Sequence, residues 1–113
     1  MDLNLVVLAG RIAADPEIRT FEPGITLLRL LVTVRSTAPT RRIDVVPVVM
    51  WSPDDNVVDE LMLGRNVWVA GSVQRRFWSA DSGRRSRLEV VAHEVSFRDD
   101  SACDGDEGEQ GAA

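Results

Sequence analysis

Residues 67–78 read VWVAGSVQRRFW and residues 84–95 read RRSRLEVVAHEV, with the turn-forming sequence SADSG between them. Two β-prone runs around a short segment of turn formers predict one long β-hairpin. Side chains alternate between the two faces of a strand, so the valines of the first arm can enter a core. The same alternation places Arg76 and Trp78 on an exposed face near the turn.

Five arginines gather around that turn: Arg75, Arg76, Arg84, Arg85 and Arg87. A basic surface interleaved with aromatic rings is typical of proteins that bind single-stranded nucleic acid, because arginine pairs with phosphate and a flat ring stacks on an unpaired base. A solvated hairpin end explains the same residues equally well. The hairpin by itself therefore leaves both interpretations open.

The length of 113 residues indicates one domain, and the 44% hydrophobic content is enough for a small core. No apolar run reaches the ~18 residues of a membrane span, and the first residues lack the charged start of a signal peptide. The single cysteine, Cys103, excludes an internal disulfide and is consistent with a reducing cytoplasm.

The net charge of −5 argues at first against nucleic acid, but the charges are unevenly distributed. Residues 1–98 hold 13 arginines and 12 carboxylates, which gives +1, whereas residues 99–113 hold six carboxylates and no basic residue, which gives −6. The second segment has almost no large apolar residue. We therefore expect a folded domain over 1–98 and an acidic, disordered tail over 99–113.

Three further strands are expected before the hairpin, at residues 3–10, 25–35 and 43–51. Turns at Asp15-Pro16 and Pro23-Gly24 separate the first two, and a polar loop at 36–42 separates the last two. Within the third of these strands, Pro47 lacks an amide hydrogen. The strand should therefore be bulged there or unpaired on one side.

A short helix is expected between the third strand and the hairpin. Ser52 suits the N-cap, Pro53 the first helical position, and the following two aspartates the positive end of the helix dipole. The helix is expected to run to about Leu63, with Val57, Val58, Leu61 and Met62 as its apolar stripe, and Gly64 ends it. Three strands, one short helix and two strands in roughly 95 residues predict an all-β, five-stranded Greek-key barrel, the OB-fold, with its helix between strands three and four.

Three blocks of this chain resemble bacterial single-stranded DNA-binding proteins, and together they cover about residues 3–97. The blocks are Asn4–Ile12 with Asp15–Arg19, Val48–Trp51 followed after the helix by Leu63–Arg65, and Val67–Val73 with Arg76, Trp78 and Asp81–Gly83. The resemblance implies a homotetramer, or a dimer, that wraps single-stranded DNA over its barrels and stacks bases on aromatic rings.

By position, the resemblance assigns stacking roles to Trp78 and Trp51. Two other stacking aromatics of the family are missing from this chain. The family has an aromatic residue six positions before Trp51, where this chain has Val45, and an aromatic in the loop after the second strand, which this chain lacks. The family's tail ends in an acidic, hydrophobic tip that recruits replication and repair proteins. This chain ends in Gly111-Ala112-Ala113, so such recruitment is in doubt.

We therefore predict a DNA-binding set of two rings and eight arginines, with the last three arginines as weaker candidates: Trp51, Trp78, Arg75, Arg76, Arg84, Arg85, Arg87, Arg29, Arg41 and Arg42. A core position for Trp51 or Trp78 is the competing interpretation, and Trp68 is better explained by core or subunit contact. No catalytic triad spacing, zinc pattern or phosphate-binding glycine loop is present, so no catalytic residue, metal or cofactor is expected.

Two classes of function remain. The first is non-catalytic binding of single-stranded DNA in replication, recombination or repair, in the cytoplasm and at the nucleoid. The second is an OB-fold interaction or replication-restart protein whose barrel face binds protein, with weak DNA binding, as the missing rings would allow. Binding to oligo(dT) that weakens with salt separates the two.

Overall fold

The computed structural model describes residues 1–98, and the predicted tail at 99–113 lies outside the described residues. Six strands and one helix follow in order: β1 (Val6–Ile12), β2 (Glu17–Phe21), β3 (Ile25–Ser36), β4 (Arg42–Trp51), α1 (Asp55–Glu60), β5 (Asn66–Ala80) and β6 (Gly83–Arg98). Within this part of the chain, no helix has the length and hydropathy needed to span a membrane.

Five of the strands close a barrel. Neighbours follow the order β1, β5, β6, β4 and β3, and β1 then pairs with β3 through Arg11 and Ile12. All of these pairs are antiparallel except β4 and β6, which run parallel at Val48 and Val49. Because α1 lies between the third and fourth barrel strands, the predicted OB-fold is confirmed.

β2 is an element that the sequence interpretation missed. It lies outside the closed ring and pairs with β3 over its whole length, from Glu17 opposite Arg29 to Phe21 opposite Ile25. All five of its side chains are exposed, so it lacks the apolar alternation by which a strand is normally recognised.

The helix is shorter than predicted, and Ser52 is not its N-cap. Asp54 occupies the N-cap position, and the helix ends at Glu60 because Leu61 adopts an extended conformation. The amide of Ser52 donates a hydrogen bond to the carbonyl oxygen of Thr26 at 2.7 Å, and Ser52 has a φ of 51°. This bond ties Ser52 to the end of the β3–β4 ladder, so the chain must turn before the helix begins.

Pro47 pairs with a neighbouring strand on one side only, because it has no amide hydrogen to donate on the other. The antiparallel ladder with β3 continues through Pro47, opposite Leu31, without a shift of register. On the other side, β4 pairs with β6 only at the next two residues, Val48 and Val49. The prediction that the strand is unpaired on one side at Pro47 is therefore confirmed.

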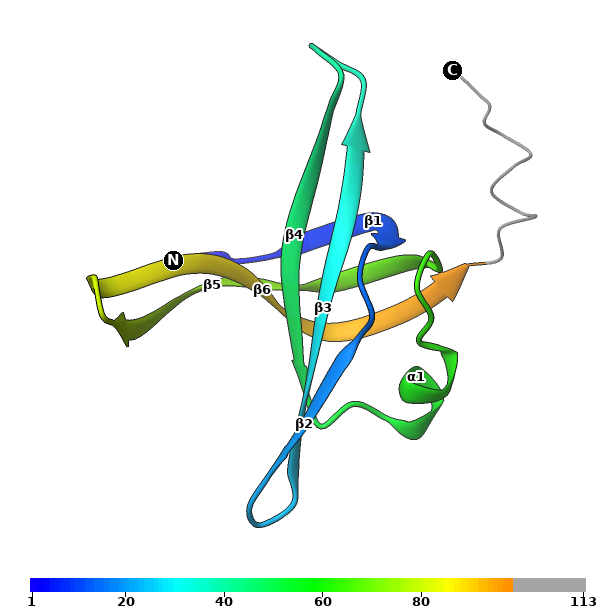
Figure 1. Ribbon diagram of the computed structural model, residues 1–113. Helices are drawn as coiled ribbons and strands as arrows, with labels where there is room; N and C mark the ends of the chain where they lie inside the picture. The colour runs from blue at the N-terminus through cyan, green and yellow to red at the C-terminus, as the bar shows by residue number, and fades with distance from the viewer. Residues whose placement is uncertain (99–113) are drawn as a thin grey trace.

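The core fills the inside of the barrel with aliphatic side chains from every barrel strand. Its most deeply buried members are Ile12, Leu28, Val32, Val48, Val67 and Val69, and Val57 of α1 covers the open end beside them. The strands are longer than this core. In Figure 1 the β3–β4 pair and the β5–β6 hairpin continue beyond the barrel as two arms that point in different directions.

Two glycines permit the backbone contacts that close the barrel. A Cβ atom built on Gly10 would lie 2.1 Å from the carbonyl oxygen of Thr33, and one on Gly71 would lie 2.0 Å from that of Val91. Gly71 also borders the register shift between β5 and β6. At both positions a side chain would force two strands apart.

We expect Gly10→Ala and Gly71→Ala each to lower the free energy of unfolding by about 1–3 kcal/mol, the usual cost of overpacking. Thermal and chemical denaturation measure this cost. Ser72→Ala, one residue along β5, is the control and should change stability by less than about 0.5 kcal/mol. Equal stability of Gly71→Ala and the control would mean that the two strands can separate without cost.

Candidate nucleic-acid interface

A groove of about 530 Å³ lies on the outside of the barrel, between the β2–β3 hairpin and the β5–β6 hairpin. Four strands supply the side chains that could contact a ligand: Arg19 and Phe21 from β2, Arg29 from β3, Trp51 from β4, and Gln74 to Phe77 from β5. Leu27 of β3, Val49 of β4, and Glu89 and Val91 of β6 complete the lining. Volumes of this size are typical of sites for small molecules or single bases.

Aromatic rings mark both sides of the groove. Trp51 is 53% exposed and packs against Phe21, with ring centroids 6.2 Å apart and ring planes tilted by 42°. Phe77 is 52% exposed and lines the groove from the hairpin. Since none of these rings is buried in the core, each has a face available for stacking.

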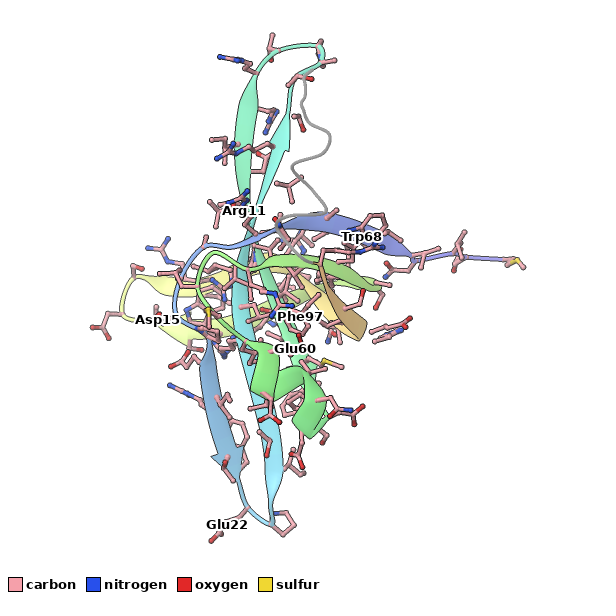
Figure 2. The ribbon with its side chains drawn as sticks, turned by 90° about the vertical axis from the view of Figure 1, so that its right-hand side faces the viewer. Arg11, Asp15, Glu22, Glu60, Trp68 and Phe97 are labelled. Carbon is pink, nitrogen blue, oxygen red and sulfur yellow. The ribbon has the colours of Figure 1, made fainter. Side chains whose placement is uncertain are left out.

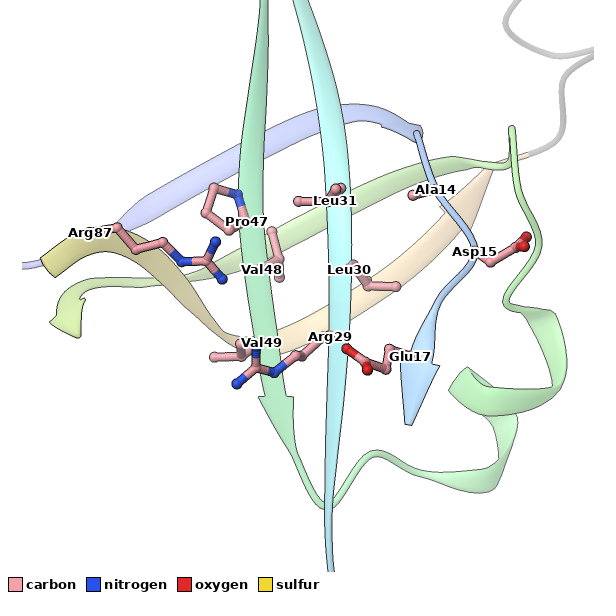
Figure 3. Close-up of a pocket in the computed structure, with 10 residues that line it drawn as sticks. All are labelled: Ala14, Asp15, Glu17, Arg29, Leu30, Leu31, Pro47, Val48, Val49 and Arg87. Carbon is pink, nitrogen blue, oxygen red and sulfur yellow. The ribbon is translucent and has the colours of Figure 1, made fainter. Parts of the chain in front are cut away.

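Arginines line the groove between the rings. Arg19, Arg29, Arg75 and Arg76 all contribute to it, and Arg75 donates a hydrogen bond to the Oγ of Ser86 at 3.2 Å. Arg29 also lines a neighbouring hollow of about 220 Å³ together with Arg87. Figure 3 shows the guanidinium groups of Arg29 and Arg87 approaching β4 from opposite sides. Positive charge therefore extends from the groove along the outer face of β4.

Glu89 is the one acidic residue in the lining of the groove, and it is buried. It lies opposite Gln74 in the β5–β6 ladder. Its Oε1 is 3.8 Å from the Nε of Arg87, which is an ion pair but exceeds hydrogen-bonding distance. A carboxylate at this place weakens the attraction of the groove for phosphate.

The outer half of the β5–β6 hairpin carries three more of the predicted residues, Trp78, Arg84 and Arg85. Trp78 is 40% exposed, and the guanidinium group of Arg76 lies 6.0 Å from the centre of its ring. Arg84 stacks on Phe77 at 4.7 Å. Arg85 lies opposite Trp78 and donates from Nε to the Oγ of Ser82 at 3.0 Å. Arg76, Trp78 and Arg85 share one face of the hairpin, and Phe77 and Arg84 share the other.

Arg41 and Arg42 lie elsewhere. They line a separate hollow with Arg35 and Ile43, where the β3–β4 arm ends. The Nη2 of Arg42 donates to the carboxylate of Asp44 at 2.7 Å, and this hydrogen bond raises the pKa of Arg42. Arg42 stays positively charged but already has a counterion, so it offers less to a phosphate.

Sequence reasoning missed four groove residues: Arg19, Phe21, Phe77 and Glu89. The first two belong to β2, which was not recognised as a strand. Phe77 falls on the alternation face that enters the core nearer the barrel, but here the hairpin has passed the end of the core. A comparison of the length of the hairpin arms with the height of the barrel would have shown that Phe77 lies beyond the core. The sequence has no comparable signal for the burial of Glu89.

Two further positions bear on the stacking hypothesis, and the core position considered for Trp68 is not what the structure shows. Val45 is 56% exposed and lies on the same outer face of β4 as Trp51, so a ring at this position would face the same side. Trp68 is 43% exposed and lies outside the groove, opposite Ala9 of β1, with the guanidinium group of Arg98 4.6 Å from its ring centre. Figure 2 shows it beside β1.

Comparison with known proteins identifies similar chains. A model of the single-strand binding protein family matches residues 3–98. The single-stranded DNA-binding protein of Clostridium tetani is 36% identical over 102 residues, and that of Caldanaerobacter subterraneus is 35% identical over 101 residues. Each alignment covers 84% of this chain, and 70% and 67% of the respective relative.

A third relative, the single-stranded DNA-binding protein 2 of Listeria monocytogenes, is 34% identical, and the alignment covers 63% of its length. This chain therefore spans about two thirds of the length of its relatives. Among solved structures, a Plasmodium falciparum SSB complex with ssDNA superposes with a TM-score of 0.75, covering 88% of this chain and 97% of that one. At 24% identity, this similarity shows a common fold.

The exposure of Trp51 leads to a test that separates stacking from a core role. Trp51→Ala should leave the melting temperature nearly unchanged and weaken binding of a single-stranded oligonucleotide by about 1–3 kcal/mol, the usual range for loss of base stacking. Val45→Trp should tighten binding, and Val45→Leu, which adds bulk without a ring, should not. A large loss of stability in Trp51→Ala with unchanged affinity would assign the ring to packing instead.

Proposed function

Because the chain belongs to the single-strand binding protein family, we propose that it binds single-stranded DNA without catalysing a reaction on it, and so protects or organises the strand during replication, recombination or repair. The observation that carries this proposal is the groove, in which Trp51, Phe21 and Phe77 alternate with arginines from three strands. Rings that stack and cations that pair with phosphate are the two requirements for binding an unpaired strand.

The strand would enter the groove at Trp51 and leave along the hairpin past Arg76, Trp78 and Arg85. In this path Arg29, Arg75, Arg76, Arg84, Arg85 and Arg87 contact phosphates, and Trp51 and Trp78 stack on bases. Arg41 and Arg42 lie apart from the path and would contact only a strand that continues onto the β3–β4 arm. We place this activity in the cytoplasm, at the nucleoid.

Each phosphate contact releases counterions, so affinity should fall with salt with a log–log slope of about −0.7 for each contact on a single strand. Arg76→Ala and Arg85→Ala should each flatten the slope for oligo(dT) by about 0.7. Arg11→Ala removes the same charge outside the groove and should leave the slope unchanged. Fluorescence titrations with oligo(dT) at several salt concentrations measure the slope for the wild-type protein and the three variants.

Weak binding to oligo(dT) that does not respond to salt would contradict the proposal. It would favour the alternative, an OB-fold protein whose outer barrel face contacts another protein. The Val45 position supports that alternative, because an exposed aliphatic residue stands where a stacking ring would strengthen DNA binding. The groove rings and arginines make the first function the better explanation.

We further propose that the chain assembles with copies of itself into a homotetramer, or at least a dimer. Beside Val6 to Gly10, one edge of β1 pairs with β5, and the opposite edge pairs with no other strand in residues 1–98. Leu3, Leu5 and Val7 are 88%, 66% and 57% exposed. A free strand edge with exposed apolar side chains is typical of an interface between symmetric copies.

Light scattering at micromolar concentration should therefore give the mass of a tetramer or dimer. Val7→Glu should shift the protein toward the monomer, because it places a charge on the apolar edge of β1. Thr20→Glu, an exposed change on β2, is the control and should leave the mass unchanged. A monomeric wild-type protein would contradict the assembly proposal.

A further inference from the structure

The outer part of the β5–β6 hairpin carries an exposed aromatic ring on each of its two faces. Phe77 and Trp78 are neighbours in β5, so their side chains point to opposite faces of the strand. Both rings are exposed. In Figure 1 this part of the hairpin projects beyond the barrel, away from α1 and from the β3–β4 arm. Each face of the hairpin is therefore open to a ligand.

The face with Trp78 belongs to the strand path that leads out of the groove. Arg85 lies directly opposite Trp78, and the guanidinium group of Arg76 lies 6.0 Å from the centre of its ring. Arg75 and Arg84 lie on the opposite face by the same alternation. A strand that stacks on Trp78 would have to pass round an edge of the hairpin to reach both of them.

The face with Phe77 has its own set of cations around the ring. The guanidinium group of Arg84 lies 4.7 Å from the centre of the ring. Ser86 lies opposite Phe77, and its Oγ accepts a hydrogen bond from Nη1 of Arg75 at 3.2 Å. This bond holds a second guanidinium group beside the ring.

This second face combines apolar and basic side chains. Within residues 73–79 and 84–88 it carries no carboxylate, and its side chains are Val73, Arg75, Phe77, Ser79, Arg84, Ser86 and Leu88. An exposed ring and the flat guanidinium group stacked on it can each hold an unpaired base, and the arginines can pair with phosphates. The face therefore has charge and shape that are complementary to single-stranded DNA.

The turn at the end of the hairpin favours a separate segment of DNA on this face. The two arms meet at Asp81-Ser82, and Asp81 is exposed there. Its carboxylate repels phosphate, so a strand that follows Trp78 outward is discouraged from continuing over the turn. The edges of the hairpin present backbone groups, because the side chains point to the two faces. Neither route offers a strand a cation on its way from one face to the other.

We propose that Phe77, Arg75 and Arg84 bind a second, separate segment of single-stranded DNA, so that the hairpin lies between two segments, one on each face. This inference rests on the proposed function, because it gives a single-strand binder a second contact for the same ligand. Stacking and charge do not depend on the identity of the base, so the second face accepts any sequence. Each protomer then holds two segments close together.

The test counts the short oligo(dT) molecules bound per protomer in calorimetric titrations, with oligomers of about six nucleotides, near the lower end of the site sizes of OB-folds. Phe77→Leu keeps apolar bulk but removes the ring. It should weaken one oligomer about tenfold, the effect of losing one stacked base, so that one fewer oligomer binds at concentrations that saturate the wild-type protein. Phe77→Trp restores a ring and should keep the wild-type number.

The number bound separates two segments from one. If a single strand uses both faces, Phe77→Leu weakens binding without changing the number of oligomers per protomer. If this face instead packs against another copy of the chain, Phe77→Leu changes the mass in light scattering and leaves the number unchanged. Either result would overturn the inference and leave the proposed function intact. Failure of the wild-type protein to bind any oligo(dT) would overturn the proposed function itself.

A charge variant tests the same face without altering its ring. Arg84→Ala should weaken one oligomer and leave the affinity of the other unchanged, with the difference shrinking as salt rises. Arg11→Ala, which removes an arginine outside the hairpin, is the control and should leave both oligomers as tightly bound as in the wild-type protein. Equal binding of every oligomer by Arg84→Ala and the control would contradict a second segment on this face.

Discussion

Closing the barrel requires β1 to cross β3 at a backbone separation that no side chain at Gly10 would permit. The crossing joins the two ends of the sheet through only two residues of β1, Arg11 and Ile12. It sets where the barrel ends, and the strands that extend beyond it must leave in different directions. The groove lies on the outside of the barrel at the contact of β4 with β6, where Val49 and Val91 pair and both line it.

The length of the strands relative to the core explains why so many apolar side chains are exposed. Along β5, Val67 and Val69 are buried, but Phe77 on the same alternation face is 52% exposed because the hairpin has left the barrel. In a core these residues would contribute to stability. Beyond it, rings such as Trp51 and Phe77 are free to contact a ligand.

Charge distribution matters more in this protein than net charge. The chain as a whole carries −5, yet the groove gathers arginines from β2, β3 and β5, and β6 adds Arg84, Arg85 and Arg87 on the hairpin. Several of these arginines stack on rings, as Arg84 does on Phe77, which holds the guanidinium group in place while leaving it charged. Glu89, buried among them, opposes this field at one point and gives that point a different chemistry from the rest of the groove.

The sequence by itself determined the hairpin, the order of the barrel strands and the cluster of arginines around the turn. These features follow from alternation, turn formers and local composition, which act between residues close together in the chain. Only the tertiary structure decided that β2 is a strand, that Phe21 meets Trp51, that Arg41 and Arg42 lie apart from the groove, and that Glu89 is buried in it. Each of these depends on which distant strands become neighbours when the barrel closes, and local patterns carry no information about that pairing.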